Sequence, residues 1–400
     1  MLSLRTFKKV LLLLSVASLS FILLLIIRLD DFASRTSITK NGLVNRRNKT
    51  ILIWNGFDIL DSSTFGEGHE PFIKHRCQVS ECIVYYNASS LPLEQYDAIL
   101  IHVILLNQTH LLPTFPRRKY QRFVFLTQES PDSMIDKAVN VTTLGNVFNW
   151  TMSYKANSDI PMFYGRIIPK STAPKNLKET QQRIRETHLA ENYAANKTRL
   201  VAWLVSHCET PGHRERYVTQ LRKFIRVFIY GDCGTFKCAQ SSLYPSTSST
   251  ECYSMIESKY KFYLSFENSI CDDYVTEKFF EAMNLRLIPI VYGGANYSKI
   301  APVHSYINAL EYSPQELANY LKILDANDTL YNEFFWWKDH YEVESHVTQM
   351  SRHSFCDLCK KLHHDEGVIK FYPTLEPDWL PRTQCKRISK KCSIVLKPSD

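Results

Sequence analysis

Residues 260–280 read YKFYLSFENSICDDYVTEKFF and contain a complete change of secondary structure. Lys261–Glu267 is a short run rich in aromatic and apolar residues, which predicts a buried strand. A polar turn follows, and the pattern then predicts a helix over Tyr274–Asn284. Leu287–Tyr292 is a second apolar strand. A strand, a helix and a strand at this spacing predict a doubly wound α/β fold.

The predicted helix begins near Asp272 or Asp273, since both are competent N-cap residues. Four of its side chains fall at i, i+3, i+4 and i+7 and share one face: Tyr274, Glu277, Lys278 and Glu281. A helix N-terminus with a nearby ammonium group stabilises an anionic diphosphate, so this segment is a candidate phosphate site. An ordinary amphipathic helix with solvated charges is the alternative from pattern alone.

The same alternation of strands and helices continues in both directions. Strands are predicted at Ile51–Trp54, Cys82–Tyr86, Asp97–Leu106, Arg122–Thr127, Leu200–Ser206 and Arg226–Gly231. Helices are predicted at Leu177–Leu189, Arg214–Phe224, Pro314–Leu324 and Asp328–Tyr341. The polar stretch 171–198 suggests an interdomain connection. This pattern predicts two doubly wound α/β domains that face a cleft. The ligand is expected beyond the carboxyl ends of the strands.

The N-terminus carries an uncharged apolar run, Val10–Ile27. Its 18 residues just suffice to span a bilayer, and the cations before it predict a cytoplasmic tail at 1–9. We therefore expect a type II signal anchor at 10–27 in contact with lipid, a stem at 28–49 and a lumenal body. A cleaved signal peptide is the alternative, although no clean cleavage site follows Ile27.

Cysteines and glycosylation sequons fit a lumenal body. All 11 cysteines and eight N-x-[ST] sequons lie beyond the apolar run. Three close pairs are candidates for local disulfides: Cys77/Cys82, Cys233/Cys238 and Cys356/Cys359. Cys356 and Cys359 with His363 and His364 also have zinc-ligand spacing, but we favour disulfides in an oxidising lumen. The net charge of +8 suits an acidic partner, and no basic cluster with interleaved aromatics indicates nucleic-acid binding.

An ordered set of motifs resembles the α1,3-fucosyltransferases. Residues 260–280 are similar to the donor-binding signature of that family, and residues 288–294 (IPIVYGG) are similar to its next strand and turn. Residues 200–208 (LVAWLVSHC) and 301–307 (APVHSYI) also resemble family motifs. In the N-terminal half, the strand that ends in Glu129-Ser130-Pro131 and the run FNWTMSY at 148–154 resemble the family as well.

This resemblance implies an enzyme that transfers L-fucose from GDP-fucose, with inversion, onto a GlcNAc residue of a glycoprotein glycan in the Golgi. The acceptor is open between the N-glycan core and an outer antenna. The resemblance also implies a GT-B-type fold, with an acceptor-side domain at 50–170, a GDP-fucose-binding domain at 199–345 and a cysteine-containing segment at 346–400. No cofactor is required beyond the donor, and no divalent metal is expected for binding. We therefore favour capping over metal ligation by Asp272 and Asp273.

The resemblance assigns a role to individual side chains. Glu129 occupies the position where the family carries its general base, and a carboxylate at a strand end can accept the proton of an attacking hydroxyl. The alternative is that Glu129 caps or braces the Ser130-Pro131 turn that follows it. Arg214 and Lys278 would neutralise the departing diphosphate. The full expected donor-binding set is Ser206, His207, Arg214, Tyr230, Glu267, Asn268, Tyr274, Glu277 and Lys278.

Three residues depart from the family pattern. His207 stands where the family usually has Asn, Phe228 where an Asp is common, and Asp232 where a Lys is usual. These departures leave a second hypothesis open, a catalytically inactive lumenal relative that binds glycans or partner proteins. Glu129, Arg214 and Lys278 are retained and favour the enzyme.

Overall fold

The computed structural model describes residues 47–55, 65–106, 111–187, 191–237, 250–345 and 347–386. The described residues from Lys49 onward belong to one compact unit. The predicted membrane anchor at 10–27 lies outside the described residues. Within the described ranges, no helix is both long and apolar enough to cross a membrane.

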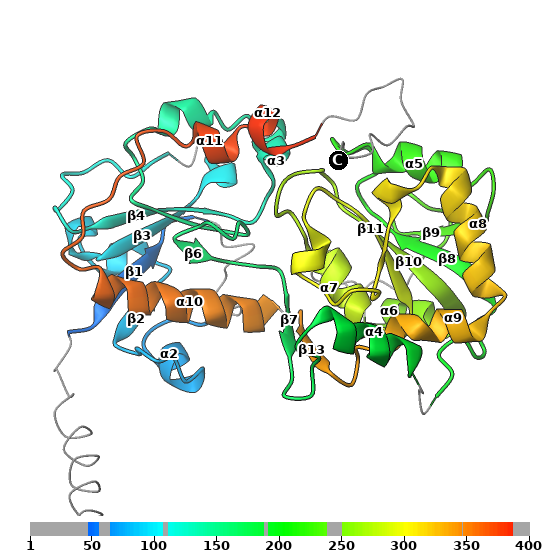
Figure 1. The fold of residues 1–400 in the computed structure, drawn as a ribbon. Coiled ribbons are helices and arrows are strands. Elements are labelled where there is room, and N and C mark those ends of the chain that lie inside the picture. The colour runs from blue at the N-terminus through cyan, green and yellow to red at the C-terminus, as the bar shows by residue number, and fades with distance from the viewer. Residues whose placement is uncertain are drawn as a thin grey trace, which may run out of the picture. The chain divides into compact units, whose positions relative to one another are not determined.

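The first sheet has six parallel strands in the order β2-β1-β3-β4-β5-β6 (Figure 1). They are β1 (Lys49–Ile53), β2 (Cys82–Tyr85), β3 (Ala98–His102), β4 (Arg122–Thr127), β5 (Trp150–Ser153) and β6 (Ile160–Pro161). Four were predicted, although β3 ends at His102 because Val103–Leu105 turns into a 3₁₀ helix, η3. The strands β5 and β6 were not predicted, because they are short and give little periodic signal.

Helices cover both faces of this sheet, and some come from the far C-terminus of the chain. The apolar face of α10 (Val347–His364) packs on one side with Phe355, Leu358 and Leu362. The other side is covered by α11 (Glu376–Trp379) and α12 (Pro381–Gln384), with Trp379 packed in the core (Figure 1). The N-terminal half adds α2 (Glu70–Lys74), α3 (Pro131–Asp136) and the 3₁₀ helices η1 (Ala88–Ser90), η2 (Leu93–Gln95) and η4 (Val141–Leu144).

The second sheet has five parallel strands in the order β12-β11-β10-β8-β9. They are β8 (Arg199–Leu204), β9 (Val227–Tyr230), β10 (Tyr260–Phe266), β11 (Ile288–Tyr292) and β12 (Ile307–Asn308). Counted along the chain within each sheet, the first order runs 2-1-3-4-5-6 and the second 2-1-3-4-5, and both are doubly wound orders. The predicted doubly wound, parallel α/β character is therefore confirmed.

The helices around the second sheet are α4 (Leu177–Arg185), α5 (Arg214–Leu221), α6 (Thr250–Lys259), α7 (Glu277–Asn284), α8 (Pro314–Asp325) and α9 (Asp328–Asn332). Three 3₁₀ helices accompany them: η5 (Tyr297–Lys299), η6 (Ala309–Glu311) and η7 (Glu333–Phe335). The prediction of one helix over Asp328–Tyr341 was wrong. The chain forms α9 and η7 there, and then enters β13 (Tyr341–Glu344), which pairs antiparallel with β7 (Arg166–Pro169).

The disulfides connect distant parts of the chain. Cys77 bonds Cys356, and Cys82 bonds Cys359, so the predicted local pairs at 77/82 and 356/359 were wrong. The physical reason is that α10 packs across the start of β2 and presents two cysteines one helical turn apart toward it. Cys208 bonds Cys233, which also excludes the predicted pair Cys233/Cys238. A fourth bond, Cys271–Cys385, ties the C-terminal segment to the loop after β10.

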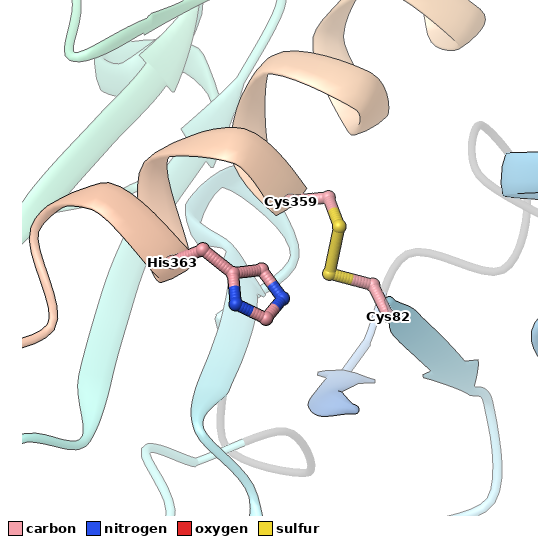
Figure 2. Close-up of side chains that lie close together, drawn as sticks. All are labelled: Cys82, Cys359 and His363. Carbon is pink, nitrogen blue, oxygen red and sulfur yellow. A yellow bond between two sulfur atoms is a disulfide. The ribbon is translucent and has the colours of Figure 1, made fainter. Parts of the chain in front are cut away.

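Figure 2 shows Cys82, Cys359 and His363 side by side. The two sulfur atoms are bonded to each other and provide no thiolate for a metal ion. His363 Nε2 lies 2.8 Å from the carbonyl oxygen of Glu81. The zinc alternative at Cys356 and Cys359 therefore fails, because both cysteines are in disulfides.

The disulfide pattern predicts which peptides stay joined under non-reducing conditions. A digest of the alkylated, unreduced protein should link the segment around 77–82 to the segment around 356–359. Mass spectrometry of the linked peptides makes the measurement, with a reduced digest as control. Peptides closed only within 77–82 or within 356–359 would contradict the arrangement.

A buried histidine lies at the end of β3. His102 is 2% exposed. Its backbone N–H donates to Asn55 Oδ1 at 2.7 Å, and Asn55 Nδ2 donates to the backbone carbonyl oxygen of His102 at 3.1 Å. Its ring Nδ1 has no hydrogen-bond partner within the described part of the chain. Burial lowers the pKa of His102 to about 4, so the ring is neutral in the folded protein near pH 7.

We predict that His102 makes stability depend on pH. The unfolded chain takes up a proton at this ring near pH 6.5 and the folded chain near pH 4, so stability falls as pH decreases through that window. Between pH 7 and 5 the loss is about 2 kcal/mol. Urea unfolding at several pH values should show this slope, and the slope should be smaller in His102→Leu. An identical slope in the variant would contradict the assignment.

Candidate active site

The loop from Glu267 to Thr276 joins β10 to α7 and is closed by one buried carboxylate. Glu267 has no exposed surface and accepts hydrogen bonds from Thr276 N at 2.8 Å and Thr276 Oγ1 at 2.7 Å. It thereby satisfies a backbone donor at the start of α7, where free N–H groups need partners. Burial raises the pKa of Glu267, and its contacts with Lys278 and Thr276 oppose that rise.

The predicted start of this helix was wrong. The helix begins at Glu277 with Thr276 as N-cap residue, so Tyr274 lies in the loop and not on the helical face. Asp272 and Asp273 make other contacts. Asp272 N–H donates to Gln384 O at 2.8 Å, and Asp273 Oδ2 accepts from Ala156 N at 3.2 Å. Neither aspartate caps α7, because Glu267 supplies the acceptor from the strand end.

The first turn of α7 carries an ammonium group between carboxylates. Lys278 Nζ lies 2.8 Å from Glu277 Oε1, 2.9 Å from Thr276 Oγ1 and 3.9 Å from Glu267 Oε2. Burial by itself lowers the pKa of Lys278, but Glu277 and Glu267 outweigh it and raise the pKa. Burial likewise raises the pKa of Glu277, but Lys278 and hydrogen bonds lower it overall. Both groups are therefore charged at neutral pH, and Lys278 keeps 22% of its side chain exposed.

Two glycines let a neighbouring turn approach this loop. A Cβ atom at Gly294 would lie 2.6 Å from the carbonyl oxygen of Cys271, and one at Gly293 would lie 2.5 Å from the Tyr297 hydroxyl. Any larger side chain would push the turn after β11 away from the loop. The Tyr292-Gly293-Gly294 sequence is thus explained by close packing against residues 267–271.

Glu129 follows β4 in the first sheet and reaches the same loop. Its Oε2 accepts from Ser133 Oγ at 3.2 Å and from Tyr274 OH at 3.3 Å. Ser130 is the N-cap of α3, with Pro131 at the first helical position, and its Oγ donates to the buried Ser269 Oγ at 2.9 Å. The structure therefore brings Glu129, Tyr274, Glu277 and Lys278 into one connected region, although they come from two different sheets.

Arg214 begins α5 and is almost fully buried at 2% exposure. Its Nη1 donates to Phe266 O and its Nη2 to His207 O at 3.1 Å, and the guanidinium lies over the Trp203 ring. Its Nε has no partner within the described residues, and burial lowers its pKa. Arg214 therefore joins the ends of β8 and β10, which are the predicted nucleotide-facing edge.

The other residues expected to bind GDP-fucose differ in their exposure to solvent. Ser206 and His207 are exposed after β8, where the Cys208–Cys233 bond fixes the following turn. The backbone carbonyl oxygen of Asn268 accepts from Gly212 N at 2.8 Å. The side-chain Oδ1 of Asn268 is buried without a partner among the described residues.

Tyr230 lies apart from this group. Its hydroxyl is 2.7 Å from that of Tyr260 and accepts from Arg199 at 3.4 Å, and these two residues begin β10 and β8. Phe228 is packed beneath the guanidinium groups of Arg199 and Arg226, and Asp232 is exposed. The departure at Phe228 therefore has a packing explanation.

Sequence reasoning missed several residues of this region, chiefly Ser133, Ser269 and Thr276. Ser133 lies four residues after Glu129 across the Ser130-Pro131 helix start, and that spacing is a usable signal. Ser269 and Thr276 gave no signal, because their partners lie on a different sheet or at the opposite end of the loop.

Matches to known families cover most of the chain. Residues 46–165 match the family described as "Fucosyltransferase, N-terminal", and residues 194–379 match "Glycosyltransferase family 10 (fucosyltransferase) C-term". The chain is therefore a glycosyltransferase. More narrowly, it belongs to glycosyltransferase family 10, the fucosyltransferases.

Individual relatives agree with this membership. The chain is 35% identical to Alpha-(1,3)-fucosyltransferase C of Drosophila melanogaster, over 83% of this chain and 77% of that protein. It is 35% identical to Glycoprotein 3-alpha-L-fucosyltransferase A of the same organism, but spans 60% of that protein's length. A human 4-galactosyl-N-acetylglucosaminide 3-alpha-L-fucosyltransferase is 31% identical over 74% of this chain and 77% of its own length. A crystal structure of an alpha1,3-fucosyltransferase with GDP-fucose aligns with a TM-score of 0.44 and 16% identity, covering 72% and 81% of the two chains.

The loop closed by Glu267 predicts a stability effect. Glu267→Ala removes the acceptor of the Thr276 backbone N–H and of the Thr276 hydroxyl proton, and should lower the free energy of unfolding by about 1–3 kcal/mol. Glu267→Gln is the matched control, because an amide can still accept from Thr276 N and donate to Oγ1. Urea titration should rank wild type and Glu267→Gln above Glu267→Ala. Equal stability of Glu267→Ala and wild type would contradict the role of Glu267.

Proposed function

We propose that this protein is an inverting α1,3-fucosyltransferase. It would transfer L-fucose from GDP-fucose to a GlcNAc residue of a glycoprotein glycan, with Glu129 as general base. One observation carries the proposal. The Glu129 carboxylate lies 3.3 Å from the Tyr274 hydroxyl. Tyr274 is followed, three and four residues later, by Glu277 and Lys278 in the first turn of α7.

The proposed reaction is a single displacement. The acceptor hydroxyl attacks C1 of fucose, its proton passes to Glu129, and the bond from C1 to the diphosphate oxygen breaks. GDP leaves with the bonding electrons, so negative charge grows on its diphosphate. The Lys278 ammonium and the N-terminus of α7 would stabilise that charge, and Arg214 would hold the strand ends that receive the nucleotide.

The donor would lie beyond the carboxyl ends of the second sheet and the acceptor beyond those of the first, in a GT-B arrangement with a cleft. Domains at 50–170 and 199–345 are part of this proposal. Ser206, His207, Asn268 and Glu277 are the proposed polar contacts of the donor. Glu267 would act through Thr276 and Lys278, since its carboxylate has no exposed surface. Tyr230 would have a packing role in the second sheet and not a donor contact, because its hydroxyl is hydrogen-bonded to that of Tyr260.

We also propose that the enzyme is a type II membrane protein of the Golgi, anchored through residues 10–27. Support comes from the apolar run Val10–Ile27 and from the four disulfides that join pairs of described residues, which suit an oxidising lumen. The name of one relative gives a glycoprotein as the acceptor, and the name of another gives a 4-galactosyl-N-acetylglucosaminide. Both acceptor types belong in the first assay.

A GDP-release assay on the lumenal fragment, residues 40–400, tests the function. With GDP-fucose and a GlcNAc-containing acceptor, we expect turnover that survives EDTA, because cationic side chains carry the diphosphate charge. Glu129→Gln cannot accept the proton and should lose a factor of about 10²–10⁴ in kcat. Asp136→Asn is the matched control, since Asp136 is an exposed carboxylate in helix α3, which begins two residues after Glu129.

The outcomes separate the hypotheses. Full activity in Glu129→Gln would reject Glu129 as the base, and loss of activity with EDTA would reject the metal-free mechanism. A folded fragment that binds glycans but neither binds nor turns over GDP-fucose would favour an inactive relative.

A further inference from the structure

The carboxylate of Glu129 is held on one side only. Both hydrogen bonds that it accepts end on Oε2, from Ser133 Oγ at 3.2 Å and Tyr274 OH at 3.3 Å. Oε1 makes no hydrogen bond within the described part of the chain. Because two donors on a single oxygen fix the rotation of the carboxylate plane, Oε1 is the oxygen left for a substrate proton.

The two donors come from different places. Ser133 belongs to α3, the helix that follows Glu129 in the chain, and its position is set by the Ser130 N-cap. Tyr274 belongs to the loop between β10 and α7, 145 residues away in the sequence. This second donor therefore connects the base to the loop that carries Glu277 and Lys278.

Packing leaves the Tyr274 ring little freedom. The residue is 2% exposed, and its ring meets those of Tyr154 and Tyr164 edge-on at centroid distances of 5.1 Å and 6.4 Å. Tyr164 is itself fixed, since its hydroxyl donates to Gln128 O at 2.7 Å. Burial raises the pKa of Tyr274 well above its usual value, and Glu129 raises it further, so the hydroxyl stays protonated and donates.

Further contacts hold the loop against the turn that carries Glu129. Ser130 Oγ donates to Ser269 Oγ, and Asp273 Oδ2 accepts from Ala156 N. The Cys271–Cys385 bond adds a covalent tie. The Tyr274 hydroxyl is thus presented to Glu129 by a loop that is fixed on both sides of it.

We propose that Tyr274 is a positioning residue for the base: its hydroxyl holds Oε2 of Glu129 and turns Oε1 toward the acceptor hydroxyl. This rests on the proposed function of Glu129. It gives Tyr274 a role different from the donor contact expected from the sequence. It also makes the orientation of the base depend on the placement of the loop that precedes α7.

The role has a kinetic signature. Tyr274→Phe keeps the ring and its packing and removes one hydrogen bond to the carboxylate. Because a hydrogen bond to the charged form favours that form, its loss should move the acidic limb of kcat/KM for the acceptor upward by about half a pH unit or more. The poorly oriented base should also lower kcat by about tenfold or more, while KM for GDP-fucose stays within about twofold.

Two further variants make the test specific. Tyr154→Phe is the matched control, because the Tyr154 hydroxyl is buried in the same aromatic cluster and has no hydrogen-bond partner among the described residues. Its profile should equal that of wild type. Ser133→Ala removes the other donor to Oε2 and should move the acidic limb in the same direction as Tyr274→Phe. It carries the test if Tyr274→Phe does not fold.

The experiment measures pH profiles of GDP release for wild type and the three variants at saturating GDP-fucose, beside Glu129→Gln. KM for GDP-fucose is measured separately, with the donor concentration varied. A raised KM for GDP-fucose with an unmoved pH profile in Tyr274→Phe would overturn the proposal and indicate that Tyr274 contacts the donor instead. An equal shift in Tyr154→Phe would overturn it too, because the effect would then be one of packing. Failure of the proposed function shows separately, as a Glu129→Gln variant that is as active as wild type.

Discussion

The hydrogen bonds between the buried Glu267 carboxylate and Thr276 organise the region proposed as the active site. Glu267 directly follows the central strand β10 and accepts hydrogen bonds from both polar donors of Thr276, so the intervening loop must return to the strand that it left. That return starts α7 at Glu277 and sets the charged pair Glu277–Lys278 at the edge of the sheet. A carboxylate without solvent is costly unless it is hydrogen-bonded, and here Thr276 and Lys278 provide the compensation.

The closed loop also carries the contacts that reach the first sheet. Ser269, Asp273 and Tyr274 each meet a residue from the segment 129–156, and Cys271 is bonded to Cys385 in the C-terminal segment. The same C-terminal region packs α10, α11 and α12 on the first sheet. The chain thus crosses to the second sheet once, returns, and is locked by disulfides near both ends of that return. Glu129, the loop 267–276 and the C-terminal segment are therefore mechanically connected.

Much of this could be predicted from the sequence, for identifiable reasons. The strands at Arg122–Thr127 and Tyr260–Phe266 are long, apolar and bounded by polar turns, so their patterns were clear. The segments that follow these two strands, together with the family resemblance, made Glu129 and Lys278 candidate site residues. The start of α7 was predicted too early, because Asp272 and Asp273 are good caps by composition, and no local pattern reveals that Glu267 takes that role. Disulfide pairing and the Tyr274–Glu129 contact depend on tertiary packing between distant segments, which spacing cannot supply.

The proposed transfer is a single displacement at C1 of fucose, and the configuration of the product tests it most directly. NMR of the fucosylated acceptor made from β-linked GDP-fucose by the lumenal fragment reads the new anomeric centre. The account predicts an α-linked fucose, because one in-line attack inverts C1. A β-linked product would contradict it, since retention requires a second displacement or attack from the leaving-group face.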